Sequence, residues 1–280
     1  MIHEVFSLQV EGSQPNAHLV TYIQDYSDSL AMRERPLILL CPGGGYAYTS
    51  DREAESMALQ FLAMGYHAAV LRYSCAPSRY PTSLLELAAS VKLIREHAEQ
   101  WHVKTDKLVI QGCSAGGHLA ASFAMFWDRD WLRERAGIAD KDPEHSLLRP
   151  NGLLLCYPVI SSGEFAHRGS FESLLGDLPG QDELLEQVSL EKQVSADVPP
   201  AFVWHTYEDQ SVPVENSLLL VSALRRAGIP TEFHMYPRGG HGLALATSLT
   251  QTSDGNCIRP ECASWISLAH TWLEGLFSLT

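Results

Sequence analysis

Short runs of consecutive apolar residues alternate along the chain with longer stretches in which apolar residues recur every three to four positions. A continuous apolar run is typical of a strand buried on both faces, and the longer spacing is typical of a helix packed on one side. The strands predicted from these runs are 37–41, 67–73, 107–111, 152–156, 199–206 and 231–236. This alternation predicts a mostly parallel, doubly wound α/β sheet with helices on both faces.

The stretches between these runs predict the helices and the less regular parts of the chain. The predicted helices are 53–64, 82–100, 114–126, 213–227 and 261–277. Two segments at 5–10 and 18–24 flank a turn and predict an N-terminal hairpin. Residues 157–199 are acidic and irregular, and we interpret them as a small cap-like insertion over the active site. The whole chain, 1–280, is then a single domain.

The first chemical motif lies between a predicted buried strand and a predicted helix. Gly112-Cys113-Ser114-Ala115-Gly116 fits the pattern G-x-S-x-G, in which a sharp strand-to-helix turn exposes a nucleophilic serine. An incidental serine at a glycine-rich helix start is the alternative, but the strand before it favours the functional interpretation. Cys113 is a rival nucleophile, although its place in the turn directs its side chain away from the cleft. We therefore predict Ser114 as the nucleophile and the N–H of Ala115 as an oxyanion donor.

A second glycine-rich segment, 42–46 (PGGGY), follows the strand predicted at 37–41. Glycines in a loop allow bare backbone N–H groups to approach a substrate, so this loop is a candidate to complete the oxyanion hole. A simple flexible turn is the alternative. A dinucleotide-binding loop fits poorly, because the G-x-G-x-x-G spacing is missing.

A serine nucleophile needs a base and an acid, which follow it in the chain order Ser, Asp or Glu, His. His241 lies among glycines after the last predicted strand, in a loop that could present it to Ser114. Asp209 follows the strand at 199–206 and is the predicted acid, with Glu208 as its nearest rival. The weaker histidine candidates are His145, His167, His234 and His270.

Four segments, 42–46, 112–120, 205–217 and 239–246, together resemble a known group. The chain resembles small bacterial acetyl esterases and xylan or sugar esterases of the α/β-hydrolase superfamily, related to hormone-sensitive lipase-like enzymes. The resemblance implies an α/β-hydrolase fold, a catalytic triad of Ser114, Asp209 and His241, and oxyanion donors at Gly44, Gly45 and Ala115. Pro42 departs from the lipase-like pattern, where a histidine often precedes the glycines.

The composition of the chain excludes several classes of binding partner. The formal net charge of −13 argues against binding a nucleic acid backbone or an anionic membrane surface. The chain shows neither a secretory signal nor an apolar run of about 20 residues, which predicts a cytoplasmic location. Cys257 and Cys262 lack a second pair at ligand spacing, so we expect no metal.

The sequence thus predicts hydrolysis of a short-chain, acetyl-type ester of a small molecule, with acetylated sugars or xylo-oligosaccharides as candidate substrates and without a cofactor. A serine peptidase of the prolyl-oligopeptidase type and a non-catalytic binding protein with this fold are the alternatives. Assembly into a homo-oligomer is left open by the sequence.

Overall fold

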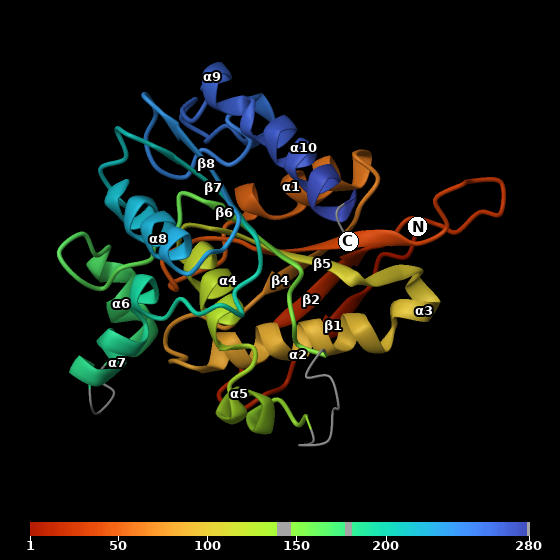
Figure 1. The fold of residues 1–280 in the computed structure, drawn as a ribbon, viewed down its shortest axis with the longest axis horizontal. Helices are drawn as coiled ribbons and strands as arrows, with labels where there is room; N and C mark the ends of the chain where they lie inside the picture. The colour runs from red at the N-terminus through yellow and green to blue at the C-terminus, as the bar shows by residue number, and fades with distance from the viewer. Residues whose placement is uncertain (139–146, 177–180, 279–280) are drawn as a thin grey trace.

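The computed structural model describes residues 1–138, 147–176 and 181–278 and shows a central twisted sheet between layers of helices (Figure 1). The described residues form one eight-stranded sheet in the order β1-β2-β4-β3-β5-β6-β7-β8. The strands are β1 (Val5–Ser7), β2 (His18–Tyr22), β3 (Arg35–Cys41), β4 (His67–Arg72), β5 (Val103–Cys113), β6 (Gly152–Cys156), β7 (Ala201–Thr206) and β8 (Thr231–Tyr236). Of the neighbouring pairs in this described sheet, only β1–β2 and β2–β4 are antiparallel, so the predicted hairpin and the mostly parallel sheet are confirmed.

Helices cover both faces of this sheet (Figure 1). One face carries α2 (Thr82–Glu96), α4 (Ser114–Phe126) and α8 (Glu215–Arg226). The other face carries α1 (Glu55–Ala63) and α10 (Trp265–Ser278). The shorter helices are α3 (Ala98–Trp101), α5 (Asp130–Arg135), α6 (Arg168–Leu175), α7 (Gln181–Gln187) and α9 (Pro260–Ala263), with 3-10 turns η1 (Asp51–Glu53), η2 (Leu190–Lys192) and η3 (Ser248–Thr250).

Strand β3 shows why the central strands are apolar throughout. Leu37, Leu39 and Cys41 point into the core beneath α2 and α4. Ile38 and Leu40 point into the core beneath α1 and α10. Because successive side chains of a strand alternate between faces, a strand with a helix layer on each face must be apolar at every position.

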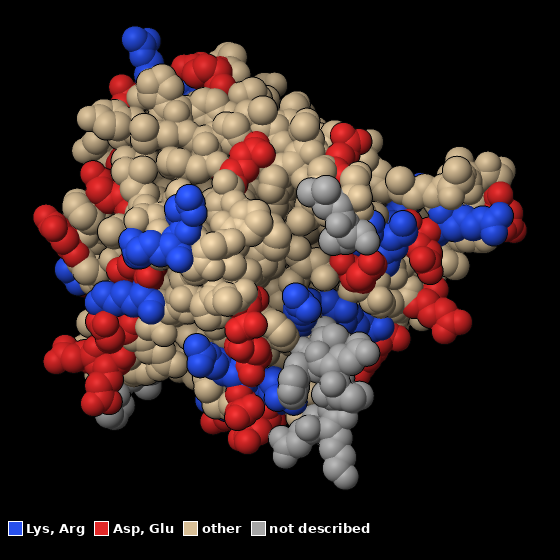
Figure 2. All heavy atoms as spheres, viewed as in Figure 1, with Lys and Arg blue, Asp and Glu red and all other residues tan. Residues whose placement is uncertain are grey.

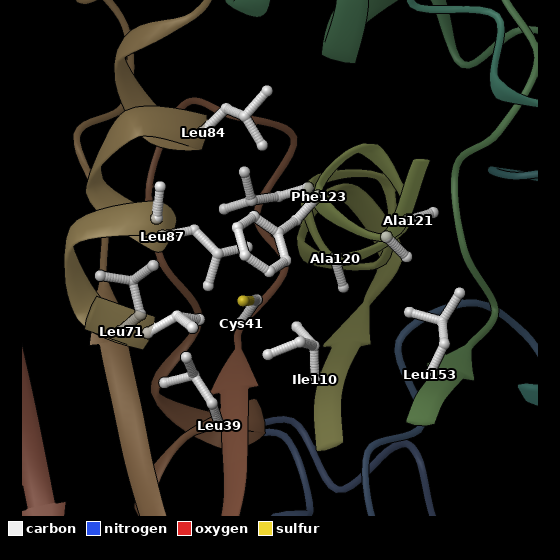
Figure 3. Packing of buried hydrophobic residues seen from close by; sticks show 14 of the residues in the cluster. Leu39, Cys41, Leu71, Leu84, Leu87, Ile110, Ala120, Ala121, Phe123 and Leu153 are labelled. Atoms are coloured by element: carbon white, nitrogen blue, oxygen red, sulfur yellow. The ribbon is translucent and has the colours of Figure 1, made fainter. Parts of the chain in front are cut away.

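The packing of α4 on the sheet fixes the position of the turn that precedes it. Figure 3 shows the Phe123 ring of α4 between Leu87 of α2 and the strand residues Leu39 and Ile110. Phe123 is fully buried, and burial of such a side chain contributes about 1.5–3 kcal/mol. Ala120, also in this contact region, is small enough to let the helix backbone lie close to the sheet.

The structure corrects three details of the predicted elements. Residues 157–199, which the sequence predicts to be irregular, contain α6, α7 and η2. Helix α7 has no fully buried residue, and only Leu184 and Leu185 pack partly against the core, so its apolar periodicity is weak. Helix α5 is not among the predicted helices because its six residues span less than two turns. The helix predicted at 82–100 is interrupted at His97, where α2 ends and α3 begins.

The surface carries charges of both signs. On the face shown in Figure 2, the described Asp and Glu side chains are interspersed with Lys and Arg. The described part of that face therefore presents no continuous basic patch for a nucleic acid backbone. None of the helices that the structure describes is both long enough and apolar enough to cross a membrane.

Candidate active site

The turn between β5 and α4 places Ser114 at the carboxyl edge of the sheet. Ser114 has a φ of +53°, a left-handed conformation that is strained for a residue with a side chain. A Cβ on Gly112 would overlap the carbonyl oxygen of Gly116, and a Cβ on Gly116 would overlap that of Cys41. Both glycines of the motif are therefore required by close backbone approach, which is the packing that this turn needs.

The structure brings Ser114, His241 and Asp209 together from the loops that follow β5, β8 and β7. Ser114 Oγ lies 2.7 Å from His241 Nε2, and His241 Nδ1 lies 2.6 Å from Asp209 Oδ2. An ionised carboxylate only accepts, so the proton between His241 and Asp209 is on Nδ1. That tautomer leaves the Nε2 lone pair free to accept the Ser114 hydroxyl proton.

Asp209 is buried and accepts four hydrogen bonds. Its Oδ1 accepts from the N–H groups of Ser211 (2.9 Å) and Val212 (3.0 Å), and its Oδ2 also accepts from His205 Nε2 (3.2 Å). Burial alone would raise the pKa of Asp209, but the hydrogen bonds from His205 and His241 outweigh it and hold that pKa well below its usual range. The carboxylate is therefore ionised beside His241.

His205 is a further residue of the site, and the sequence does not reveal it. It lies in β7, is fully buried, and donates from Nε2 both to Asp209 and to the carbonyl oxygen of Val212 (2.9 Å). Its Nδ1 lies 2.8 Å from Ser217 Oγ. A histidine within a strand pattern looks like a core residue in the sequence. Its acceptors, Asp209 and Val212, are only four and seven positions later, but they face His205 only because the loop after β7 turns back on the strand.

The rival nucleophile and acid have other contacts. Cys113 Sγ is buried next to Met57 and Gln111 on the side of the sheet away from α4, and burial raises the pKa of its thiol. Glu208 Oε2 accepts from the N–H of Gly239 (3.1 Å). Both residues thus lie outside the hydrogen-bond chain that includes Ser114.

The weaker histidine candidates have different positions. His234 pairs with Glu232 on β8, and His270 of α10 lies 2.9 Å from the hydroxyl of Tyr66. His145 lies outside the described residues. His167, directly before α6, borders the same cavity as Ser114 and His241. Of the three candidates that the structure describes, His167 is therefore the one at the site.

The glycine-rich loop after β3 borders Ser114. Gly44 and Gly45 have φ values of +126° and +64°, and a Cβ on Gly44 would overlap the carbonyl group of Tyr48. The N–H of Gly43 donates to Glu53 Oε2 (2.8 Å) and so is occupied. Ala115 is the second residue of α4, where backbone N–H groups have no partner within the helix. The role of Gly44, Gly45 and Ala115 as oxyanion donors stays a prediction.

Glu53 and Tyr157 connect this loop to the histidine loop. The Tyr157 hydroxyl donates to Glu53 Oε1 (2.7 Å) and accepts from the N–H of Ala244 (2.9 Å). The Tyr157 ring also packs edge-on against His241, with centroids 5.2 Å apart. Neither residue is a candidate from the sequence, although Tyr157 directly follows a predicted strand, which places it at the same sheet edge as Ser114.

Pro42 has no backbone N–H to donate, and the side chains of other residues stabilise the glycine-rich loop. The Pro42 carbonyl oxygen accepts from the Tyr73 hydroxyl (2.7 Å). The Tyr46 hydroxyl lies 2.8 Å from His118 Nδ1, and His118 Nε2 donates to the carbonyl oxygen of Val188 (2.8 Å). His118, which belongs to α4, thus connects the glycine-rich loop by hydrogen bonds to the segment before η2.

A cavity of about 300 Å³ opens over the nucleophile. Gly44, Gly45, Ser114 and His241 lie in its wall, and none of the described lining residues has an aliphatic side chain. The cavity therefore offers hydrogen-bonding groups rather than a long apolar channel. No group of three or more His, Cys, Asp or Glu side chains among the described residues could hold a metal ion.

Comparison with known proteins identifies the family. The BD-FAE family model matches residues 25–224, a span that holds the glycine-rich loop, the Ser114 turn and Asp209. The chain belongs to the BD-FAE family. This BD-FAE chain is 37% identical to an acetyl ester-xyloside bifunctional hydrolase from Caldicellulosiruptor lactoaceticus, with a TM-score of 0.79 over 93% of this chain and 88% of the other.

Two further comparisons extend this result. Carboxylesterase Cest-2923 from Lactobacillus plantarum WCFS1 is 29% identical, with a TM-score of 0.83 over 99% of this BD-FAE chain and 98% of the other. The α/β-hydrolase fold is thereby confirmed. Endo-1,4-beta-xylanase B of Butyrivibrio fibrisolvens is 39% identical over 219 residues, which are 76% of this chain and 33% of that protein. The chain spans between a third and just over half of the length of the curated relatives it matches.

The buried position of His118 in this BD-FAE chain predicts a pH-dependent stability. Burial lowers the pKa of His118 from 6.5 to about 4. The unfolded chain takes up this proton near pH 6.5 and the folded chain does not, so the free energy of unfolding falls as the pH drops from 6.5 to 4. We expect this histidine to contribute a slope of up to about 1.4 kcal/mol per pH unit.

Urea unfolding of the wild type and His118→Gln at several pH values between about 7 and 4 measures this slope. The variant is expected to be less stable near neutral pH and to lose less stability on acidification, so that the two curves converge. Parallel curves would contradict the assignment of this proton to His118.

Proposed function

We propose that the chain is a serine carboxylesterase that hydrolyses short-chain, acetyl-type esters through an acyl-enzyme on Ser114. The observation that carries the proposal is the continuous hydrogen-bond chain from Ser114 through His241 to Asp209, which begins in the wall of the cavity. This arrangement is the one by which a base activates a serine hydroxyl and a buried carboxylate orients that base.

In the proposed mechanism, His241 Nε2 accepts the Ser114 hydroxyl proton while Oγ attacks the ester carbonyl carbon. The negative charge on the carbonyl oxygen is stabilised by the N–H groups of Gly44, Gly45 and Ala115. The tetrahedral intermediate expels the alcohol, which takes the proton from His241, and leaves an acyl group on Ser114. Water, deprotonated by His241, then attacks this acyl group, and the acid is released as Ser114 regains its proton. No step requires a metal or an organic cofactor.

The proposed substrates are acetylated sugars or xylo-oligosaccharides. The polar wall of the cavity supports an alcohol rich in hydroxyl groups, and the lack of an aliphatic side chain among its described lining residues supports a short acyl group. A solved structure at 37% identity is named as an acetyl ester-xyloside bifunctional hydrolase, which agrees with this choice. A cytoplasmic location stays a prediction from the sequence.

A substrate panel tests the proposal. Initial rates are measured with p-nitrophenyl esters of acetate, butyrate and octanoate, with acetylated xylo-oligosaccharides, and with a chromogenic prolyl peptide. We expect turnover of acetate, a fall in kcat/KM with each longer acyl chain, and release of acetate from the oligosaccharides. Peptide cleavage without ester turnover would instead support a peptidase. No turnover together with no labelling by a fluorophosphonate would support a binding protein.

A further inference from the structure

His167 lies in the cavity wall but has no part in the hydrogen-bond chain of Ser114. It caps the N-terminus of α6 and is half-buried, and it borders the cavity together with Ser114 and His241. Its Nδ1 accepts from the backbone N–H of Ser170 (3.3 Å) and lies 2.8 Å from Ser170 Oγ. The ring is therefore held in one orientation by the helix that follows it.

These contacts favour one tautomer of the His167 ring. The N–H of Ser170 faces both the carbonyl oxygen of His167 (3.0 Å) and His167 Nδ1 (3.3 Å). Because an N–H can only donate, the second contact favours the neutral tautomer with its hydrogen on Nε2. Burial lowers the pKa of His167, and the nearby His241 lowers it further, while Asp209 and Glu172 oppose the shift. The ring is thus held in its neutral form, as a donor at Nε2.

The Nε2–H group of His167 is available to donate a hydrogen bond to a ligand. Among the described residues it has no hydrogen-bond partner, and it is not one of the polar atoms sealed from solvent without a partner. The start of α6 also lies beside the glycine-rich loop, because Ser170 Oγ would be 3.8 Å from a Cβ on Gly45. The His167 ring, whose Nε2 has no acceptor in the described part of the chain, therefore borders the same cavity as the nucleophile.

An acetyl ester offers few acceptors to such a donor. The acetyl methyl group has none, and in the proposed mechanism the carbonyl oxygen is bound by the N–H groups of Gly44, Gly45 and Ala115. The remaining acceptors belong to the alcohol part: the ester oxygen and any hydroxyl or ether oxygen beside it. When a substrate without these oxygens binds, the N–H donor is left without an acceptor. Such a substrate is therefore hydrolysed less efficiently.

We propose that His167 Nε2–H donates a hydrogen bond to the alcohol part of the ester and selects alcohols with a free hydroxyl beside the acylated position. His167 is then a substrate-contacting residue that determines specificity for polyhydroxylated alcohols. This inference rests on the proposed esterase function and deepens it, because it assigns the recognition of the alcohol to one side chain.

The test compares two substrates and two variants. The substrates are a methyl xyloside with one acetyl group next to a free hydroxyl and its analogue in which that hydroxyl is replaced by hydrogen. The measured quantity is the ratio of their kcat/KM values. His167→Phe keeps a ring of similar size without a donor, whereas His167→Gln keeps an N–H donor. His234→Phe, on β8 and paired with Glu232, is the matched control.

We expect the wild type and His234→Phe to prefer the hydroxyl-bearing substrate by about tenfold, which is what one such hydrogen bond provides. In His167→Phe the ratio should fall to near one, and in His167→Gln much of the preference should return. The inference alone would be overturned if His167→Phe hydrolysed both substrates with the wild-type ratio of kcat/KM values. It would also be overturned if the wild type hydrolysed both substrates without any preference. If the wild type hydrolyses neither these substrates nor the simple acetate esters, the proposed function fails and the inference fails with it.

Discussion

Ser114→Ala is expected to lower kcat for p-nitrophenyl acetate by about 10⁶-fold, to a residual rate set by binding and the oxyanion donors. The reason is that, among the described residues, Ser114 Oγ is the hydroxyl that contacts His241 Nε2, at 2.7 Å, so the proposed acyl-enzyme has no other group to form on. Alanine retains the Cβ, so the backbone at φ +53° experiences the same sterics and the fold should persist.

The measurement is the initial rate of ester hydrolysis, with covalent labelling by a fluorophosphonate as a second readout. Ser114→Ala should lose both, and circular dichroism should show the wild-type fold. Ser222→Ala, at an exposed position on α8, is the matched control and should retain both. A kcat within about tenfold of the wild-type value in Ser114→Ala would exclude Ser114 as the nucleophile.

The sequence could predict those parts of the molecule in which the local sequence pattern indicates the structural environment of a residue. Strand β3 is apolar from Leu37 to Cys41 because both of its faces are covered, and this pattern is visible without a structure. Gly112 and Gly116 mark the Ser114 turn because close backbone approach excludes a side chain at both positions. Such local constraints leave a direct trace in the sequence.

The residues that the sequence does not reveal depend on how separate segments fold against one another. Glu53 and Tyr157 are 104 positions apart. His205 and Asp209 are only four positions apart, but they meet only because the loop after β7 turns back on the strand. Each looks like an ordinary core or helix-start residue in the sequence. His167 is a weak candidate there because the surrounding segment has no clear periodicity, although α6 places it at the cavity. Tertiary contacts of this kind have no signature in spacing or composition.

Asp209→Asn is expected to lower kcat by about 10⁴-fold, the effect of an equivalent change in other serine hydrolases. In the wild type, two donors face each carboxylate oxygen: the N–H groups of Ser211 and Val212 at Oδ1, and the rings of His205 and His241 at Oδ2. Asparagine replaces one oxygen by an NH₂ group, which must then face two donors whichever way the amide turns.

The less costly arrangement is for the introduced NH₂ group to face the rings, since His241 can move its proton from Nδ1 to Nε2. That tautomer presents an N–H to Ser114 and can no longer accept the serine proton, so kcat falls while KM for a small ester changes little. The measurement is the kcat and KM of Asp209→Asn with p-nitrophenyl acetate. Glu208→Gln, at an exposed position one residue earlier, is the control and should stay within about threefold of the wild type, because its carboxylate accepts from the N–H of Gly239 rather than from His241. A larger loss in Glu208→Gln than in Asp209→Asn would show that Glu208 orients the histidine instead.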